Sequence, residues 1–271
     1  MSLKKKRILF VVEGLRREMG IFDNLGTVFF NEKSDVITLP VPADMNIYML
    51  YAAMKKDDFE TDVMELLKER IPAAKKILEP YCRDDFAEVY FFFDFDAHSN
   101  NLHEMDNVDA LREMLEKLNN ETEMGKLYIS YPMVEALRDY VVGDCRVVSG
   151  PCLRRRKEFD SYKHDSAANP DNNAIKDYAF LRWKEVLLCY AHRVSCLFQT
   201  SELDYRSFVD GVTPSSIFEQ QMRIYAFSEN VFILSCLPEF LIDYSAKYWN
   251  AAVGKRKKPI RHKECPKPRV G

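Results

Sequence analysis

The strongest predicted strand of the chain ends in two aspartates whose spacing could place them side by side. Three phenylalanines, residues 91–93, are followed by Asp94 and Asp96. Residues two apart in an extended chain point to the same face, so both carboxylates would share one side of the strand. Open α/β sheets place ligands beyond the carboxyl ends of their strands, and carboxylate oxygens suit Mg²⁺ or Mn²⁺. The pair predicts a metal site; the alternative is a solvated turn in which an aspartate caps a helix.

Further acids stand where they could join this pair. Glu13 follows the short apolar run of residues 8–12, which predicts a first buried strand. For Glu18, the alternative is an acid in the first turn of a helix, which the helix dipole favours. Glu135 has the same alternative, because a proline three residues earlier predicts a helix start. His98 comes just after the aspartates and could contact metal, water or phosphate, or be an ordinary loop histidine.

An Asp-x-Asp motif after an apolar strand occurs in several classes of enzyme. Phosphatases of the haloacid-dehalogenase type use the first aspartate as a nucleophile, and nucleotide-sugar glycosyltransferases use the motif to hold a metal. Toprim nucleases and topoisomerases have it too. Those phosphatases usually carry the motif on their first strand, whereas the first predicted strand here ends in Glu13. Glu-Gly after strand one, with Asp-x-Asp after a later strand, resembles the Toprim arrangement.

The resemblance extends to two sequence motifs of a narrower group. Residues 13–18, Glu-Gly-Leu-Arg-Arg-Glu, are similar to the Glu-Gly-x-x-x-Glu start of RloB-like and OLD-like Toprim nucleases of phage defence. Residues 130–135, Ser-Tyr-Pro-Met-Val-Glu, resemble their Ser-Asn-Pro-x-x-Glu motif, with Tyr131 in place of asparagine. The resemblance covers residues 7–140, about half of the 271-residue chain.

This resemblance implies a role for each acid and a class of reaction. Glu13 would be a metal ligand or the general base, Asp94 and Asp96 would be metal ligands, and Glu18 and Glu135 would complete the acidic cluster. Toprim nucleases cut phosphodiester bonds with Mg²⁺ or Mn²⁺, so the expected substrate is DNA or RNA, transfer RNA included. The resemblance also implies an ABC-type ATPase as a partner, and because the chain has no Walker loop, any ATPase activity must come from a partner.

Clusters of basic residues are the candidates for contact with phosphate. Within residues 1–254 they are Arg16, Arg17, Arg154, Arg155, Arg156 and Lys163. The alternative for them is a solvated charged surface. Residues 255–271 hold eight Lys or Arg against one acid, so the rest of a chain of net charge −3 carries −10. We expect this basic tail to strengthen nucleic-acid binding without specifying sequence.

Strand and helix signals alternate in the first half of the chain and predict an α/β fold. We expect a Toprim-like domain over residues 1–150, with a parallel sheet covered by helices on both faces and a helical insertion at about 45–79. A mainly helical region, 151–254, and a flexible basic tail, 255–271, would follow. The expected strands are residues 8–12, 35–39, 87–93 and 126–130. The expected helices are 16–30, 108–118, 174–198, 214–227 and 237–249, and residues 154–173 are expected to form a linker or mobile loop.

The composition of the chain restricts the class of protein to which it can belong. Hydrophobic residues make up 47% of the chain, which is typical of a globular protein. No apolar run reaches the length of a membrane span, and the N-terminal apolar run is too short for a signal peptide. An odd number of cysteines, seven, without a CxxC pair predicts free thiols and a cytoplasmic protein. A dimer is compatible with the sequence. The functional alternatives are a DxD phosphohydrolase and a catalytically silent module that binds nucleic acid or a partner ATPase.

Overall fold

The computed structural model describes eight stretches of the chain, which belong to two compact units. They are residues 5–14, 17–30, 34–41, 45–95, 107–140, 152–168, 174–200 and 205–253, with backbone alone at 17, 18, 168, 205–207 and 251–253. The first unit is Met1–Tyr128 and the second is Ile129–Gly271. The predicted domain boundary at residue 150 and the predicted tail, 255–271, lie outside the described residues.

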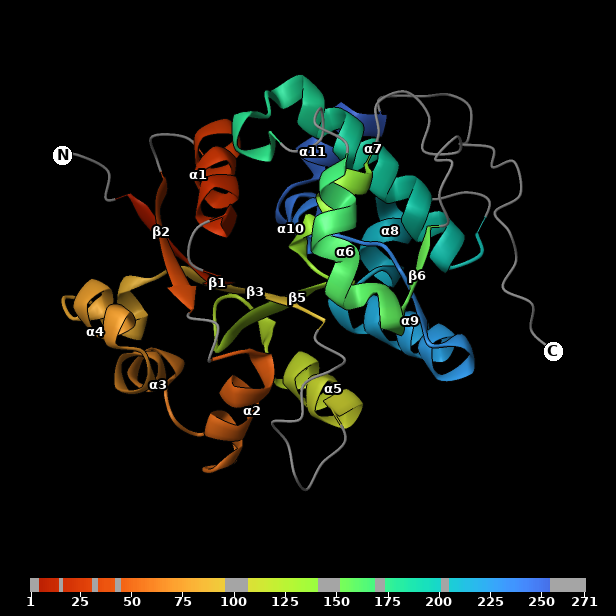
Figure 1. Ribbon diagram of the computed structural model, residues 1–271. Helices are drawn as coiled ribbons and strands as arrows, with labels where there is room; N and C mark the ends of the chain where they lie inside the picture. Colours follow the sequence, from red (N-terminus) through yellow and green to blue (C-terminus); the bar gives the residue numbers. More distant parts are fainter. Residues whose placement is uncertain are drawn as a thin grey trace. The chain divides into compact units, whose positions relative to one another are not determined.

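A five-stranded, mainly parallel sheet organises the first unit (Figure 1). Its strands are β1 (Lys6–Glu13), β2 (Ser34–Val41), β3 (Glu88–Asp94), β4 (Asn119–Asn120) and β5 (Gly125–Ser130). Their order across the sheet is β2-β1-β3-β5-β4. β1 runs parallel to both β2 and β3, and the short β4 runs antiparallel to β5. The predicted α/β class and the four predicted strands are confirmed.

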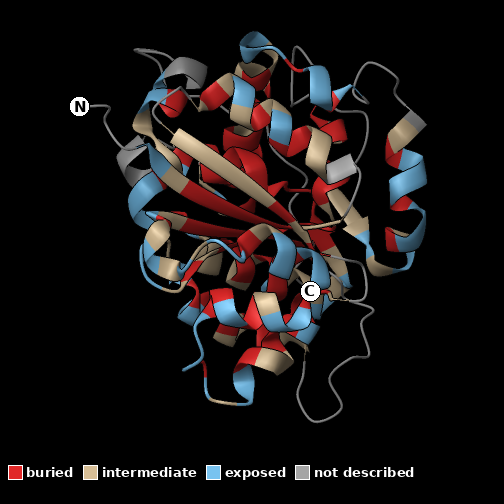
Figure 2. Ribbon diagram, turned by 90° about the vertical axis from the view of Figure 1, so that its left-hand side faces the viewer, coloured by how far each residue is buried: buried red, intermediate tan, exposed pale blue. Residues whose placement is uncertain are grey.

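Helices cover both faces of this sheet. They are α1 (Arg17–Phe29), α2 (Ile47–Lys55), α3 (Val63–Arg70), α4 (Pro72–Leu78) and α5 (Asn107–Lys117). α1 lies on one side of the sheet, and α2 to α5 lie on the other (Figures 1 and 2). Residues 8–12 of β1 are completely buried, as expected for a central parallel strand covered on both faces. The predicted insertion at 45–79 is α2, α3 and α4, and the helical structure breaks between Lys55 and Val63 and again before Pro72.

β2 continues two residues beyond its predicted end. A proline is expected to close this strand, yet Pro40 lies within β2 and is paired in register with Val12 of β1. The physical reason is that β2 is an edge strand of the sheet. An edge strand needs backbone hydrogen bonds on one side only, so it tolerates a residue without an N–H group.

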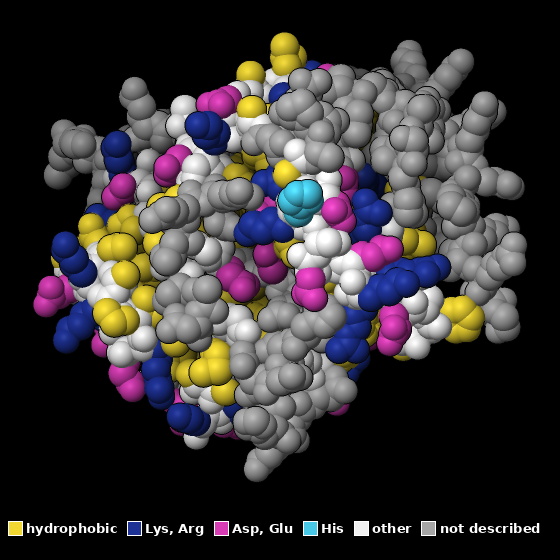
Figure 3. Space-filling model, viewed as in Figure 1, with side chains coloured by type: hydrophobic (Ala, Val, Ile, Leu, Met, Phe, Trp, Pro, Cys, Tyr) yellow, Lys and Arg dark blue, Asp and Glu magenta, His cyan; other side chains and the backbone are white. Residues whose placement is uncertain are grey.

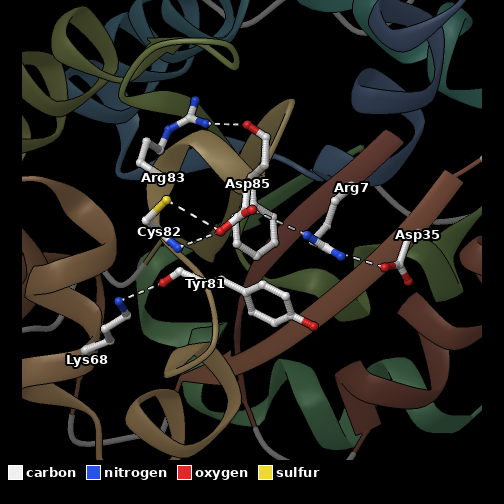
Figure 4. Close-up of polar contacts among 8 residues, drawn as sticks. Arg7, Asp35, Lys68, Tyr81, Cys82, Arg83 and Asp85 are labelled. Atoms are coloured by element: carbon white, nitrogen blue, oxygen red, sulfur yellow. Dashed lines mark hydrogen bonds and ion pairs between the residues drawn. The ribbon is translucent and has the colours of Figure 1, made fainter. Parts of the chain in front are cut away.

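A network of charged side chains lies at the end of the sheet where β1 and β2 begin (Figure 4). The guanidinium of Arg7 on β1 lies 3.3 Å from an Asp35 oxygen on β2 and 3.9 Å from an Asp85 oxygen on the connection into β3. It also lies 4.5 Å from the centre of the Tyr81 ring. The second carboxylate oxygen of Asp85 accepts the backbone N–H of Cys82 at 3.0 Å. One arginine therefore ties two strands to the chain segment that precedes the third.

The second unit is mainly helical, with a small two-stranded sheet. Its larger elements are α6 (Phe159–Asp165), α7 (Phe180–Leu197), α8 (Tyr205–Gly211), α9 (Pro214–Ser228), α10 (Cys236–Tyr244), α11 (Ala246–Val253), β6 (Leu153–Arg155) and β7 (Asn230–Phe232). Among its described residues the 3₁₀ helices are η2 (Val134–Asp139), η3 (Arg156–Glu158), η4 (Ser166–Ala168) and η6 (Ile175–Asp177). β6 pairs antiparallel with β7. The described residues contain no helix long and apolar enough to cross a membrane.

Three expectations for this unit are corrected. The predicted linker at 154–173 forms β6, η3, α6 and η4 as far as residue 168, because Phe159 and Tyr162 anchor it by being buried. The predicted helix at 174–198 is interrupted near Tyr178, whose buried ring packs edge-on against Trp183 at 5.7 Å. The predicted helix at 237–249 is interrupted at Ser245, whose backbone is extended, with φ −159°.

The expectation that the thiols are free is wrong at Cys196. Cys196 is disulfide-bonded. The described cysteines with free thiols are Cys82, Cys152, Cys189 and Cys236. Cys82 is exposed, whereas Cys189 and Cys236 are buried.

A buried glutamine completes the backbone hydrogen bonds of β7. The side-chain amide of Gln221 on α9 donates to the Phe232 carbonyl at 2.9 Å, and its oxygen accepts the Phe232 N–H at 2.8 Å. Gln221 is fully buried. The side chain thus occupies the two hydrogen-bonding positions that a neighbouring strand would fill at Phe232.

Replacing Gly125 by alanine should destabilise the first unit. Gly125 has φ +120°, and a Cβ atom there would overlap the edge of the buried Phe91 ring. Backbone strain and overpacking together should cost about 2–4 kcal/mol. Gly26→Ala is the control, because no atom lies within 4 Å of the position of its new Cβ atom. Since alanine favours the helix more than glycine does, this variant should increase the free energy of unfolding by about 0.5–1 kcal/mol. Chemical denaturation measures both, and equal signs for the two variants would contradict the prediction.

Gln221→Leu should destabilise the second unit by about 2 kcal/mol or more, because two buried backbone groups of Phe232 lose their partners. The neighbouring Gln220 is only partly buried, so Gln220→Leu should change the free energy of unfolding by about 0.5 kcal/mol or less. Urea denaturation of both variants checks this difference. Similar stabilities for the two would show that the amide contributes little.

Candidate functional site

The ends of β1 and β3 bring two of the predicted acids to one edge of the sheet. Glu13 is the last residue of β1, and Asp94 is the last residue of β3. The strands are neighbours and run parallel, so their carboxyl ends meet. The chain leaves β1 to form β2 on one side and later returns to form β3 on the other. This is a topological switch point, where doubly wound sheets bind their ligands.

A hydrogen bond joins the two residues. The backbone N–H of Asp94 donates to Glu13 Oε2 at 3.1 Å, and both residues are partly buried. The chain turns directly after Glu13, where Gly14 has φ +103°. This left-handed conformation favours glycine, and the Gly14 N–H donates to the Val41 carbonyl at the end of β2 at 3.0 Å. The turn therefore binds to β2 while the Glu13 side chain reaches the end of β3.

The donor chemistry at this edge suits a hard divalent cation. Glu13 and Asp94 supply carboxylate oxygens, the ligand type of Mg²⁺ and Mn²⁺. Within the part of the chain that the structure describes, no three metal-ligating side chains form a cluster. The third predicted ligand, Asp96, and the nearby His98 lie outside the described residues.

The remaining predicted residues near this edge are described only in part. Arg17 and Glu18 begin α1, and their side chains are not among the described groups. Arg16 lies outside the described residues. The structure thus brings together Glu13 and Asp94 of the five predicted acids, and it leaves Asp96 and Glu18 as predictions.

Glu135 belongs to the second unit and is paired there with a lysine. It lies on η2, is 2% exposed, and its Oε1 is 3.1 Å from Lys163 Nζ on α6. Among the described residues, neither Glu135 oxygen accepts a hydrogen bond. A predicted metal ligand and a predicted phosphate-binding residue are therefore each other's counter-ions.

The predicted phosphate-binding arginines stand on ordered structure. The Arg154 guanidinium lies 5.7 Å from the centre of the Tyr162 ring. The backbone N–H of Arg155 donates to a Glu158 carboxylate oxygen at 3.1 Å, and that of Arg156 donates to the carbonyl of Glu229 at 2.8 Å. Figure 3 shows Lys and Arg side chains on this face, beside an exposed histidine and between acidic side chains.

Sequence reasoning missed a buried arginine next to η2. Arg193 on α7 is 1% exposed and donates to the carbonyls of Ile233 and Asp139, both at 2.7 Å. Its guanidinium lies 4.5 Å from the centre of the Tyr140 ring. The Tyr162 hydroxyl donates to the Asp139 carboxylate at 2.6 Å, and burial first, then Asp139, raises the Tyr162 pKa. The available signal was an arginine on the apolar face of a predicted helix.

The chain was compared with known protein families, curated proteins and solved structures. No known protein family, curated protein or solved structure matched the chain. The Toprim resemblance accordingly rests on the motif residues and on the strand ends to which they belong.

A three-residue contact links the helices that follow β2 and β3. α2 comes after β2, and α5 comes after β3. The Tyr51 hydroxyl on α2 donates to Glu113 Oε2 on α5 at 2.7 Å, and Lys55 Nζ donates to Glu113 Oε1 at 2.5 Å. The hydrogen bonds from Lys55 and Tyr51 lower the pKa of Glu113. Burial and the bond to Glu113 raise the Tyr51 pKa to about 12.

The stabilisation from this contact should depend on pH in a defined direction. The folded-state pKa of Glu113 is lowered from its ordinary value of 4.5. The stabilisation that its carboxylate gives to the folded state is therefore fully present above pH 4.5 and is lost as the pH falls through the folded-state pKa. The neutral Tyr51 hydroxyl stabilises the folded state below pH 10, and this stabilisation is lost as the pH rises towards its folded-state pKa of about 12. Glu113→Gln should therefore destabilise the protein at neutral pH and much less in acid.

Denaturation curves at several pH values check this behaviour. The control is Glu116→Gln, because Glu116 is an exposed carboxylate on the same helix. The stability difference between wild type and Glu113→Gln should shrink as the pH falls, while that of Glu116→Gln should stay near zero. A Glu113→Gln difference that grows in acid would contradict the assignment.

Proposed function

We propose that the chain is a Mg²⁺- or Mn²⁺-dependent nuclease of the Toprim type that cleaves phosphodiester bonds in nucleic acid, acting as an antiphage defence effector. The observation that carries the proposal is the contact between Glu13 and Asp94 at the switch point of a parallel sheet. Acids at the ends of two adjacent parallel strands, with a glutamate on the first, match the Toprim arrangement of motifs. The enzyme would work in the cytoplasm.

The roles of the residues follow from their chemistry. Asp94 and Asp96 supply carboxylate oxygens for the metal, and Glu13 is a further ligand or the base that accepts a proton from the attacking water. When bound, the metal neutralises charge on the attacked phosphate and on the leaving oxygen. The backbone N–H of Asp94 orients the Glu13 carboxylate through the 3.1 Å hydrogen bond. Glu18 extends the acidic cluster in this proposal.

Basic residues would supply the contacts to the substrate. Arg16 and Arg17 follow the Glu-Gly turn, close in sequence to the proposed metal ligand, and the tail adds a second source of positive charge. Such contacts give affinity without reading sequence, so DNA and RNA are both substrates to be tested. An ABC-type ATPase would supply any nucleotide-driven step, since the chain carries no Walker loop.

Glu13→Gln and Asp94→Asn should each reduce cleavage by about 100-fold or more, because each variant keeps the shape of the side chain and removes its charge. Stability should hold, since both residues are only partly buried at the sheet edge. The assay is cleavage of labelled DNA and transfer RNA with Mg²⁺ or Mn²⁺, with and without a candidate ATPase. The control is Asp35→Asn, because Asp35 is a β2 carboxylate that pairs with Arg7 at the opposite edge of the sheet.

Other outcomes would favour the alternatives. Full activity in Glu13→Gln overturns the Toprim assignment. A phosphohydrolase would need Asp94 as its nucleophile and would tolerate the Glu13 variant. A parent protein that binds nucleic acid but does not cleave it with either metal would be a silent binding module. Equal loss in Asp35→Asn would indicate a general effect on the fold.

A further inference from the structure

The ion pair between Glu135 and Lys163 is unusual because its two members differ in burial. The Glu135 side chain is 3% exposed, whereas that of Lys163 is 51% exposed. Among the described residues, Lys163 is the cation paired with this carboxylate, and neither carboxylate oxygen accepts a hydrogen bond. A buried carboxylate needs a charge partner to offset the loss of its hydration. Lys163 therefore reaches inward from the solvent to neutralise a fixed buried charge.

The surface around Lys163 carries more basic than acidic groups. Residues 154–165 contain five Lys or Arg and three acids, with the exposed His164 among them. Two of the acids are engaged locally: Glu158 accepts the Arg155 N–H at 3.1 Å, and Asp165 accepts the Ser161 hydroxyl at 2.8 Å. Figure 3 shows that Lys and Arg side chains are intermixed with Asp and Glu on this face. Such a surface complements a polyanion better than an acidic or apolar partner.

We propose that residues 154–164 form a contact surface for the phosphate backbone of nucleic acid, and that Glu135 is the resident counter-ion of Lys163 on it. The inference rests on the proposed function insofar as nucleic acid is the partner. A phosphate and the Glu135 carboxylate compete for the same ammonium group. Glu135 thereby has a role in substrate affinity, in place of the metal-ligand role that the family resemblance implies.

The competition follows from the geometry. When the Lys163 ammonium group turns to a phosphate, it leaves Glu135 buried without the partner that lies 3.1 Å away in the free protein. The loss of that pair opposes binding, so Glu135 weakens the contact that Lys163 makes. Removing the Glu135 charge should release Lys163 for phosphate without removing any group that touches the nucleic acid.

A double-mutant cycle in binding tests this proposal. Fluorescence anisotropy with labelled single-stranded DNA and RNA, in EDTA and over a range of NaCl concentrations, measures affinity with no cleavage. Glu135→Gln should tighten binding by about two- to fivefold, the scale of a partly exposed ion pair. Lys163→Gln should weaken it and reduce the slope of log K against log[NaCl] by about 0.7–0.9. The double variant should bind like Lys163→Gln alone.

Asp165→Asn is the matched control, because Asp165 is an exposed acid on the same surface whose carboxylate lies near His164. Removing its charge should strengthen binding slightly in both the wild-type and the Lys163→Gln backgrounds. Melting temperatures check the pair independently of binding: Lys163→Gln should lower the melting temperature, and adding Glu135→Gln should restore it.

Several results would overturn the proposal. They are unchanged affinity in Glu135→Gln, a Glu135→Gln effect that persists without Lys163, or a wild-type protein that binds neither oligonucleotide. Loss of Mg²⁺-dependent cleavage in Glu135→Gln at unchanged affinity would make Glu135 a metal ligand instead. Because binding is measured without metal, the cycle succeeds or fails separately from the proposed nuclease activity.

Discussion

β1 is buried on both faces and hydrogen-bonded along both edges, so every other element of the first unit must be placed around it. The aromatic core depends on this position: the Phe10 ring of β1 packs edge-on against Phe22 at 5.8 Å and Phe92 at 5.4 Å. The site depends on it too, because the chain leaves β1 to form β2 on one side and later forms β3 on the other, which makes the end of β1 a switch point. A shift of β1 by one residue would turn the Glu13 side chain to the other face of the sheet.

The parts of the fold that could be predicted from sequence are those with a strong local signal. The apolar runs of β1 and β3 are visible in hydrophobic periodicity, and Asp57, Asp58 and Pro72 indicate the breaks in the insertion at 45–79. Glu13 and Asp94 were predictable as neighbours because parallel strands end at a common edge. The position of Pro40 within β2 was not, because strand order decides whether a proline is tolerated and order is a property of the whole sheet.

The second unit was harder to predict because its polar residues act over long sequence separations. Lys163 meets Glu135 from another element, and Arg193 binds the carbonyl of Asp139, far away in the chain. The segment 154–168 looks like a loop from its charge, yet two buried aromatic residues fix it in place. In the first two cases a charged side chain satisfies a buried group that local sequence does not identify.

Gln221 of α9, whose side chain binds the last residue of β7, affects whether strands of other molecules can add to this sheet. Exposed strand edges recruit strands from other molecules, and that is a common route to aggregation. At Phe232 the amide of Gln221 already occupies both backbone groups on the side of β7 away from β6. A foreign strand would have to displace a fully buried side chain before it could pair there. The amide thus blocks strand addition at this position of β7, and the backbone bonds between Leu234 and Tyr131 occupy the next position along the chain.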